Sequence, residues 1–371
     1  MKKACILTSV HPVFDARIFH KEARSLVKAG YDVTLIAQHH EMEIVDGIRI
    51  VPLPKPKNRI QRMIKLQRLL LISALKEKAD IYHFHDPEII PVGILLKLFG
   101  HKVIYDMHEL VFSSIDDKRW IRVGFVKKLF KLLYKIFESL SLNLFDQIIL
   151  AEESYQKHFQ QNNKNITKFT LIRNYALSNY LNYLPKAIDN KKRDRIIYVG
   201  SLAEVRGIRE IIQSMEYVGA RAELWLAGSW ESDEFREICE GSGNWDKVRY
   251  LGFIPVDEVY KHIMCASIGL SVLYPLKNYL ESIPTKAFDY MLCSLPIIMS
   301  RFPYWEKLFK SCALFTDPHD PKDIADKILF LLNSKDLRDE MGRAGKGLVQ
   351  EKYSWKIEEK KLLSLYERLL A

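Results

Sequence analysis

The chain has 371 residues, 48% of them hydrophobic, which is enough for two domains of ordinary size and excludes a disordered protein. Residues 1–180 hold the whole net charge of +10. This asymmetry predicts an anionic partner, either a membrane surface or nucleic acid, that faces the first half only. The five cysteines are scattered without a Cys-x-x-Cys pair, which predicts buried thiols in a reducing cytoplasm and excludes a disulfide framework.

The N-terminal apolar run is short and has no cleavage site, so we expect no secretion signal. No window approaches the about 18 uncharged apolar residues that a membrane span needs. Short apolar runs then alternate with helical patterns. In the first half, the runs that predict strands are 4–10, 32–38, 48–53, 81–85, 102–108 and 147–152. The segments with helical spacing between them include 17–29, 60–78 and 88–99.

The second half repeats this alternation. Its strand candidates are 195–201, 222–228, 248–253, 268–274, 295–300 and 312–316. Apolar strands that alternate with helices predict parallel sheets covered on both faces, and hence two doubly wound α/β domains that face each other across a cleft. We place the domains at residues 1–180 and 190–354, with a C-terminal helix at about 355–371 that crosses back onto the first domain. Ligands of such sheets bind at the carboxyl ends of the strands.

The loop after the strand at 195–199 carries one candidate site. Gly200 allows the backbone to approach a ligand, and a helix begins at about Ile208 with free N–H groups at its N-terminus. Arg206 adds a cation whose fork suits a phosphate. These features favour a diphosphate site, but an ordinary strand–helix turn with a solvated arginine explains them equally well.

The stretch NYLESIPTKAFDYMLCSLPIIMS, residues 278–300, carries a second candidate. Pro284 suits the first turn of a helix that runs to about Leu292, with Glu281 in the preceding loop and Asp289 inside the helix. Two carboxylates beside free backbone N–H groups suit a sugar nucleotide, whose diphosphate takes the N–H groups and whose hydroxyls donate to the acids. Alternatively, Asp289 only supports the helix and Glu281 is solvated.

The motifs G-S-L-x-x-x-R-G, L-A-G, L-G-F-I-P, E-S-I-P-T-K-A-F-D-Y-M and L-P-I-I follow one another in this order. This order resembles retaining glycosyltransferases of the GT-B fold, in particular the large family-4 group that builds bacterial polysaccharides. The family's E-x7-E motif occurs as Glu281-x7-Asp289. The resemblance implies that Glu281 holds the donor sugar, Asp289 the ribose, the amides of 282–285 the phosphate, and 251–254 the nucleobase.

The donor-binding residues that the resemblance implies are Gly200, Ser201, Arg206, Phe253, Ile254, Glu281, Ser282, Ile283, Pro284, Thr285 and Asp289. Two of them depart from the family pattern. Ser201 stands where the family usually has an arginine, so Arg206 holds the phosphates with less help. Asp289 stands where glutamate is commoner and has a shorter reach to the ribose.

The first half holds the expected acceptor-side and cleft residues. Asp15 and Arg17 lie in a polar loop after the first strand, where the family often has a glycine-rich loop. His85 ends the strand at 81–85, and a lone histidine at such a place is more often structural. The resemblance matches His108 to the family's cleft histidine and Asn174 to its cleft asparagine. The catalytic residues that we predict are His108, Arg206 and Glu281.

The resemblance predicts a retaining, metal-independent hexosyl- or N-acetylhexosaminyl-transferase. We expect a UDP- or GDP-linked donor, a glycan or lipid-linked acceptor in surface polysaccharide biosynthesis, and no further cofactor. The sequence has no Asp-x-Asp and no clustered His or Cys ligands for a metal. The alternatives are a GT-B sugar-nucleotide epimerase and a non-catalytic basic nucleic-acid-binding protein.

Segment 118–137 carries seven basic residues and no acidic one, and its lysines and apolar residues fall on opposite faces of a helix. A second basic stretch lies at 55–68. A cationic amphipathic helix suits the inner face of the cell membrane, where a lipid-linked acceptor lies. A packed helix with a solvated basic face is the alternative. Nucleic acid is the poorer explanation because the sequence has no recognisable binding motif.

Overall fold

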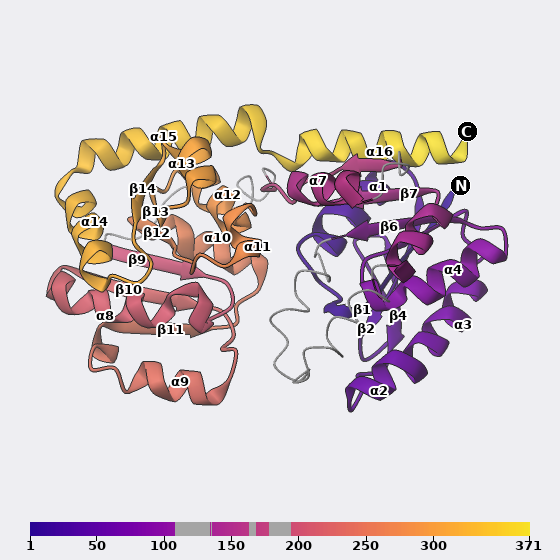
Figure 1. Cartoon of the computed structure of the whole chain (residues 1–371), viewed down its shortest axis with the longest axis horizontal. Coiled ribbons are helices and arrows are strands. Elements are labelled where there is room, and N and C mark those ends of the chain that lie inside the picture. The colour runs from indigo at the N-terminus through magenta and orange to yellow at the C-terminus, as the bar shows by residue number, and fades with distance from the viewer. Residues whose placement is uncertain (108–133, 135, 163–167, 178–193) are drawn as a thin grey trace. The chain divides into compact units, whose positions relative to one another are not determined.

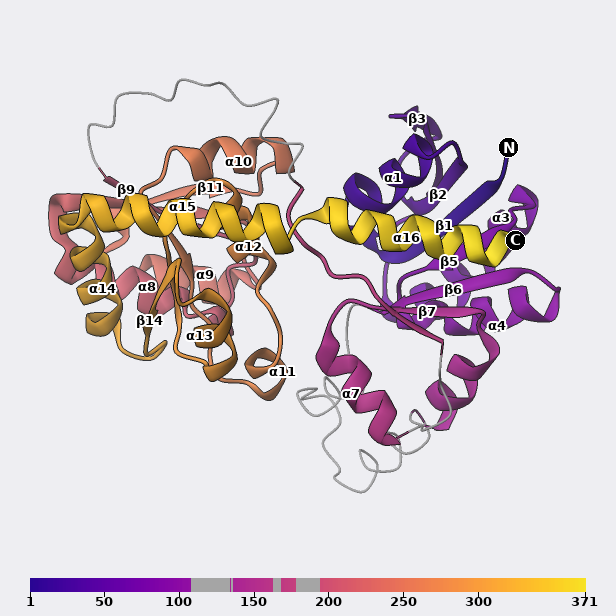
Figure 2. The ribbon, with the colours of Figure 1, turned by 90° about the horizontal axis from the view of Figure 1, so that it is seen from above.

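The computed structural model describes residues 1–107, 134, 136–162, 168–177 and 194–371. The chain divides into two compact units. Unit 1 contains Met1–Asn174 and Ile357–Ala371, and unit 2 contains Tyr175–Lys356. In each unit, helices pack around the strands of one sheet (Figures 1 and 2). In the part of the chain that the structure describes, no helix combines the length and the apolar character that a membrane crossing requires.

The sheet of unit 1 has the strand order β3-β4-β2-β1-β5-β6-β7-β8. Its strands are β1 (Lys3–Pro12), β2 (Asp32–Gln38), β3 (Glu43–Val45), β4 (Ile48–Leu53), β5 (Ile81–Phe84), β6 (Lys102–Met107), β7 (Gln147–Leu150) and β8 (Phe169–Leu171). All neighbours pair in parallel except β3 and β4, which are antiparallel. The sequence predicts no strand at β3, because this three-residue strand is not buried and shows no apolar run.

Helices cover the apolar faces of this sheet. They are η1 (Ile18–Ala23), α1 (Arg24–Lys28), α2 (Arg59–Gln61), η2 (Arg62–Leu66), α3 (Gln67–Glu77), η3 (Pro87–Ile89), α4 (Ile90–Leu98), α7 (Glu153–Asn162) and α16 (Trp355–Leu370). Helix α16 is the yellow C-terminal helix of Figure 1, and its residues Leu362, Leu365 and Tyr366 are buried. The C-terminal residues therefore contribute to the core of unit 1.

The sheet of unit 2 is entirely parallel, with the order β11-β10-β9-β12-β13-β14. Its strands are β9 (Asp194–Val199), β10 (Ala222–Ala227), β11 (Val248–Gly252), β12 (Ile268–Ser271), β13 (Ile297–Ser300) and β14 (Ala313–Thr316). Every apolar run that the sequence predicts as a strand overlaps a strand of one of the two sheets. The prediction of two parallel-sheet α/β domains is confirmed.

The helices of unit 2 follow its strands in alternation, as parallel pairing requires. They are η5 (Glu204–Arg206), α8 (Ile208–Val218), η6 (Gly219–Arg221), α9 (Asp233–Glu240), η7 (Trp245–Lys247), α10 (Val256–Met264), α11 (Lys277–Leu280), α12 (Thr285–Leu292), α13 (Pro303–Phe309), α14 (Pro321–Asn333) and α15 (Lys335–Lys352). Pro284 precedes α12 as its N-cap residue instead of lying inside the first turn, with an extended backbone at φ −70° and ψ 113°.

Candidate functional site

The candidate site of unit 2 lies where the strand order of its sheet reverses. From β9 the order continues to β10 and β11 on one side, and to β12, β13 and β14 on the other. The loops that follow β9 and β12 therefore leave the sheet in opposite directions. Doubly wound sheets bind their ligands at this position, beyond the carboxyl ends of the strands.

The loop after β9 brings bare backbone to this position. Gly200 has φ +127° and Gly207 has φ +61°, a range that residues with a side chain rarely adopt. A Cβ atom on Gly228, which follows β10, would lie 1.9 Å from the carbonyl oxygen of Gly200, so the two loops pack this closely only because residue 228 is a glycine. Gly207 is the N-cap residue of α8, whose N-terminus offers free N–H groups to an anion.

Two predicted side chains lie in the same loop. Ser201 is exposed, and Arg206 ends η5 directly before α8 and is half-buried. Burial raises the pKa of the nearby Tyr198 phenol to about 12, and the Arg206 guanidinium beside it acts in the opposite direction. A cation, a helix N-terminus and glycine backbone thus lie together, which is a suitable arrangement for a phosphate group.

The two acidic residues lie on either side of the start of α12. Glu281 is exposed and is the C-cap residue of α11, and Asp289 is half-buried within α12. The hydroxyl of Tyr260, on α10, donates a hydrogen bond of 2.6 Å to Oδ1 of Asp289. Nε1 of Trp305 donates one of 2.7 Å to the carbonyl oxygen of Ser282. Both the loop at 281–284 and the Asp289 carboxylate are therefore held in place by neighbouring elements.

The remaining residues of the expected donor site occupy the surface of unit 2. Phe253, which follows β11, is 77% exposed, and Ile254 is partly exposed. Ser282 and Ile283 are partly exposed, Thr285 is exposed and Pro284 is buried. An exposed phenylalanine ring next to a glycine-ended strand is available to stack on a flat group such as a base, which leaves the predicted nucleobase contact open to test.

Lys286, in the first turn of α12, is a site residue that the sequence does not predict. Its side chain is 9% exposed, and its Nζ lies 3.4 Å from the ring centroid of Tyr198. A Cβ atom on Gly200 would lie 3.2 Å from the same Nζ, so the ammonium packs against the glycine of the predicted phosphate loop. Burial, and then the Arg206 cation, lower the pKa of Lys286 well below its ordinary value. The only signal in the sequence is a lysine on the apolar side of an amphipathic helix.

In unit 1 the strand order reverses between β1 and β5, and Arg17 lies in the loop after β1. Its side chain is 4% exposed. Nη2 lies 2.7 Å from Oδ2 of Asp106, and Nε lies 2.8 Å from Oε1 of Glu22. Nη1 donates a hydrogen bond of 3.0 Å to the carbonyl oxygen of Ile172, which follows β8. Arg17 thus ties the β1 loop to β6 and to the chain beyond β8.

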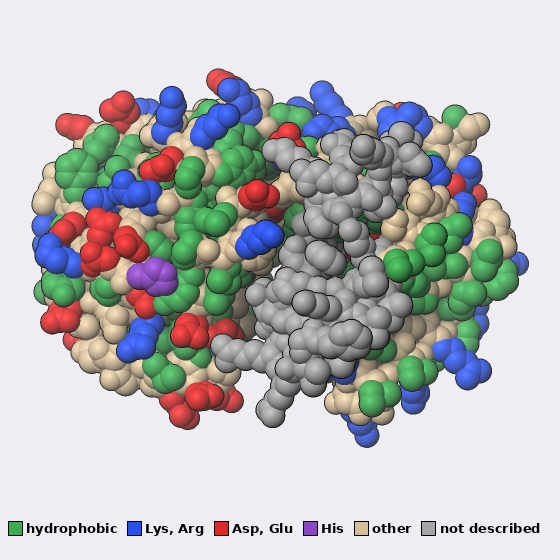
Figure 3. Space-filling view, in the orientation of Figure 1, with side chains coloured by type: hydrophobic (Ala, Val, Ile, Leu, Met, Phe, Trp, Pro, Cys, Tyr) green, Lys and Arg blue, Asp and Glu red, His purple; other side chains and the backbone are tan. Residues whose placement is uncertain are grey.

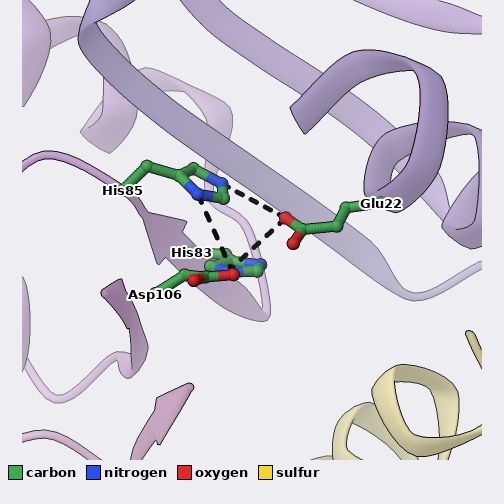
Figure 4. Close-up of side chains that lie close together, drawn as sticks. All are labelled: Glu22, His83, His85 and Asp106. Carbon is green, nitrogen blue, oxygen red and sulfur yellow. Dashed lines mark ion pairs between the residues drawn. The ribbon is translucent and has the colours of Figure 1, made fainter. Parts of the chain in front are cut away.

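Four buried side chains surround the Arg17 guanidinium: Glu22, His83, His85 and Asp106. They come from η1, β5, the residue after β5, and β6, and they point toward one another in Figure 4. Nε2 of His85 lies 3.4 Å from Oε2 of Glu22, and Nε2 of His83 lies 3.6 Å from Oδ2 of Asp106. Of these four residues, the sequence analysis singled out only His85 as a candidate.

Charge balance explains the electrostatics of this group, which we call the Arg17 network. Two carboxylates face one guanidinium, so the network is neutral when it holds one further proton. Burial, followed by the nearby Asp106, raises the pKa of Glu22 well above its ordinary value, whereas burial lowers the pKa of His83. The hydroxyl of Tyr366, on α16, lies 2.9 Å from Nδ1 of His83. The network therefore also links the C-terminal helix to the sheet.

The Arg17 network also bears on the prediction about metals. One nitrogen or oxygen atom from each of the four side chains lies within 4.8 Å of the others, and these are side chains of the types that bind metals. These four residues come from three separate parts of the sequence, so no single motif indicates the group. Arg17 already places a cation between the two carboxylates. Metal independence of the reaction stays a prediction.

The other predicted residues of unit 1 have local contacts. Oδ1 of Asp15 accepts hydrogen bonds from the backbone N–H groups of Arg17 and Ile18, and so fixes the start of η1. Oδ1 of Asn174 accepts one of 2.6 Å from Nζ of Lys21. His85 and Arg17 are buried, and their contact with an acceptor stays a prediction. His108 and most of segment 118–137 lie outside the described residues.

Comparison with known proteins gives two family matches that together cover most of the chain. Residues 16–174 match the family described as Glycosyltransferase Family 4, and residues 182–348 match the family described as Glycosyl transferases group 1. The first match covers the Arg17 network, and the second covers the phosphate loop and α12. The second match also contains β9 and β12, between which the strand order of unit 2 reverses, and the first match begins in the loop that follows β1.

Similar proteins include two relatives and one solved structure. An O-antigen chain mannosyltransferase B of Escherichia coli is 27% identical over 43% of this chain and 42% of its own. A capsular polysaccharide biosynthesis glycosyltransferase, CapM of Staphylococcus aureus, is 23% identical over 93% of this chain and 92% of its own. The Anabaena protein HepE, solved with UDP-glucose, superposes with a TM-score of 0.74 at 11% identity, over 99% of this chain and 100% of its own.

Proposed function

Because the chain belongs to the family-4 and group-1 glycosyltransferases and has the GT-B fold, we propose a specific reaction for it. The enzyme transfers a hexosyl or N-acetylhexosaminyl group, with retention of configuration and without a metal ion, from a UDP- or GDP-linked sugar. The acceptor is a glycan or a lipid-linked glycan of a surface polysaccharide. The O-antigen and capsule relatives support this acceptor class, and the UDP-glucose complex of HepE supports the donor class.

One observation carries the proposal: the start of α8, Arg206 and the start of α12 lie together at the switch point of the unit 2 sheet. Gly200 itself places no side chain at this position. In the proposed reaction the diphosphate lies against this backbone, and Arg206 stabilises the charge that develops on it as the glycosidic bond breaks. This role of Arg206 is the reason why we expect no metal ion.

In this proposal the carboxylates of Glu281 and Asp289 bind different parts of the donor. Glu281 is exposed at the end of α11 and accepts hydrogen bonds from the sugar hydroxyls. Asp289, held by Tyr260, accepts them from the ribose. Phe253 and Ile254 border the base. No side chain of unit 2 serves as a nucleophile, and the acceptor hydroxyl loses its proton to the leaving phosphate on the same face of the sugar.

A panel of nucleotides tests the donor class. We expect UDP or GDP to raise the melting temperature of the protein, with ADP as the comparison and the matching nucleosides as controls. A ligand that binds only the folded state at 100 times its Kd stabilises by about 2.7 kcal/mol, which is readily measured. The diphosphates should stabilise much more than the nucleosides because the proposed site is built around the phosphates. Equal melting temperatures throughout the panel would refute the nucleotide-sugar donor.

The surface of unit 1 supports peripheral attachment to the inner face of the cell membrane. Segment 54–76 has seven basic residues and no acidic one. It forms α2, η2 and α3, on which Ile60, Met63 and Ile64 are 72%, 55% and 69% exposed. Figure 3 shows basic and hydrophobic side chains side by side at the end of unit 1 where Figure 1 places α2. Neighbouring cations and exposed apolar side chains fit an anionic lipid surface.

Co-sedimentation with vesicles tests this attachment. We expect the protein to bind phosphatidylglycerol-containing vesicles at low salt and to dissociate as salt rises, because each basic residue near such a surface contributes about 1 kcal/mol. Replacing Lys57, Lys65 and Arg68 with glutamine should release it. The matched control replaces the exposed Lys277, Lys307 and Lys310 of unit 2 with glutamine and should not.

A second variant separates the two basic regions of unit 1. If the change of Lys127, Lys128, Lys131 and Lys135 to glutamine releases the protein and the change in segment 54–76 does not, contact is made by 118–137 instead. If the wild-type protein stays in the supernatant with anionic vesicles at low salt, its basic surface is only solvated and does not bind the membrane.

A further inference from the structure

No acidic side chain among the residues that the structure describes pairs with the ammonium group of Lys286. Its Nζ is buried and forms no hydrogen bond within the described residues, where its contact is the face of the Tyr198 ring at 3.4 Å from the centroid. A charge that is held out of water without an anion destabilises a folded chain. A methionine of similar length would fill the same space without this penalty. The position of the charge therefore calls for a functional explanation.

A second cation lies close to the first. Arg206 is near enough to lower the pKa of Lys286, and neither side chain pairs with a carboxylate among the described residues. Lys286 lies in the first turn of α12, and Arg206 directly precedes α8. The N-termini of both helices add positive potential. Two unpaired cations and two helix N-termini at one sheet edge fit a ligand with more than one negative charge.

We propose that Lys286 is a second ligand of the donor diphosphate and supplies the charge that Ser201, in place of the family's arginine, does not. This inference rests on the proposed function of the unit 2 site. In the structure without donor, the ammonium lies over Tyr198 and against Gly200. When the diphosphate binds beside Gly200, the flexible lysine side chain changes rotamer and pairs with a phosphate oxygen. The ammonium then leaves the face of the Tyr198 ring and pairs with the diphosphate anion.

The test compares Lys286→Met with wild type in two measurements. The first is the melting temperature without ligand, which we expect to rise, because the variant no longer buries an unpaired charge. The second is the Kd for UDP, GDP and inorganic pyrophosphate. We expect this Kd to increase about 10- to 100-fold for the diphosphate that wild type binds, as the loss of one charge-assisted hydrogen bond predicts, and the Kd for the nucleoside to stay unchanged.

Two further variants complete the experiment. Lys277→Met removes an exposed lysine of the same unit and should leave the Kd for the diphosphate unchanged. Ser201→Arg introduced into Lys286→Met should recover most of the lost affinity, because it returns a cation to the position used by the family. A merely structural lysine would instead lower the melting temperature on replacement and leave the ratio of diphosphate to nucleoside affinity as in wild type.

The outcomes separate this inference from the proposed function. If the wild-type protein binds UDP or GDP and the Kd is the same in Lys286→Met, the proposed role of Lys286 is refuted and the proposed donor class is kept. If the wild-type protein binds pyrophosphate but neither nucleotide, and Lys286→Met no longer binds pyrophosphate, the anion site is supported and the donor class is refuted. Wild-type binding of none of the three ligands overturns both.

Discussion

Arg17→Met should lower the free energy of unfolding of unit 1 by about 3–5 kcal/mol, the range observed when one partner of a buried ion pair is removed. Arg17 is the cation of the network, and Glu22 and Asp106 are fully buried on either side of it. Without the guanidinium, one of these two carboxyl groups keeps the shared proton. The other is a buried carboxylate with no counter-charge. The hydrogen bond to the carbonyl oxygen of Ile172 is lost as well.

Amide hydrogen exchange of the full chain measures this effect in unit 1 alone. The amides of β5 and β6 should exchange much faster in Arg17→Met, because these strands carry His83 and Asp106. Arg24→Met is the matched control, because Arg24 pairs with Asp46 at 3.0 Å on the surface, where both side chains are more than 40% exposed. Such pairs contribute about 0–1 kcal/mol. Equal losses in the two variants would contradict a buried network centred on Arg17.

The pH dependence of Glu22→Gln identifies the shared proton. The folded chain raises the pKa of Glu22 above its ordinary value of 4.5, so it holds this proton more tightly than the unfolded chain does. Its contribution to stability is complete below the unfolded pKa and is lost as pH rises through the folded pKa. Glutamine does not titrate, so the variant should lose stability less steeply with rising pH.

Dialysis against a chelator should change nothing, and a loss of stability on chelation would place a metal ion among the four side chains.

Glu281→Gln should lower turnover by about 100-fold or more and leave the Kd for the free nucleoside diphosphate unchanged. Within the described residues Glu281 forms no hydrogen bond or ion pair, so its replacement does not disturb the fold. Its proposed partner is the sugar, which is absent from the free nucleotide. The measurement is the release of nucleoside diphosphate from the donor that the panel identifies, together with calorimetric binding of that nucleotide.

Asp289→Asn should show the opposite pattern, with about 10-fold weaker binding of the free nucleotide, because its proposed partner is the ribose. Asparagine still accepts the hydrogen bond from Tyr260, so we expect the position of the side chain to be kept. Tyr260→Phe is the control for positioning and should weaken nucleotide binding less than Asp289→Asn does. The same loss of nucleotide affinity in Glu281→Gln and Asp289→Asn would refute this division between sugar and ribose.

The sequence by itself determined the strands, the alternation with helices and the fold class, because burial on both faces of a parallel sheet leaves continuous apolar runs such as 4–7 and 196–198. It also located the loops that follow β9 and β12, since glycine after a strand and proline before a helix are local signals. These signals come from neighbouring residues and do not depend on which strands pair. The short strand β3 was not predicted because it is partly exposed and buries no such run.

Only the tertiary structure decided which side chains meet. Lys286 is buried because α12 packs on β12 and β13 and its first turn brings the lysine against Tyr198 and Gly200, and nothing in the sequence around Lys286 indicates that contact. The Arg17 network exists because β1, β5 and β6 are neighbours in the sheet, which joins residues from the β1 loop, η1 and two strands. Strand order sets these distances, and the periodicity of apolar residues carries no information about strand order. The sequence therefore indicated the carboxyl ends of the strands as the place to look, and the packing of the sheets decided which charges share it.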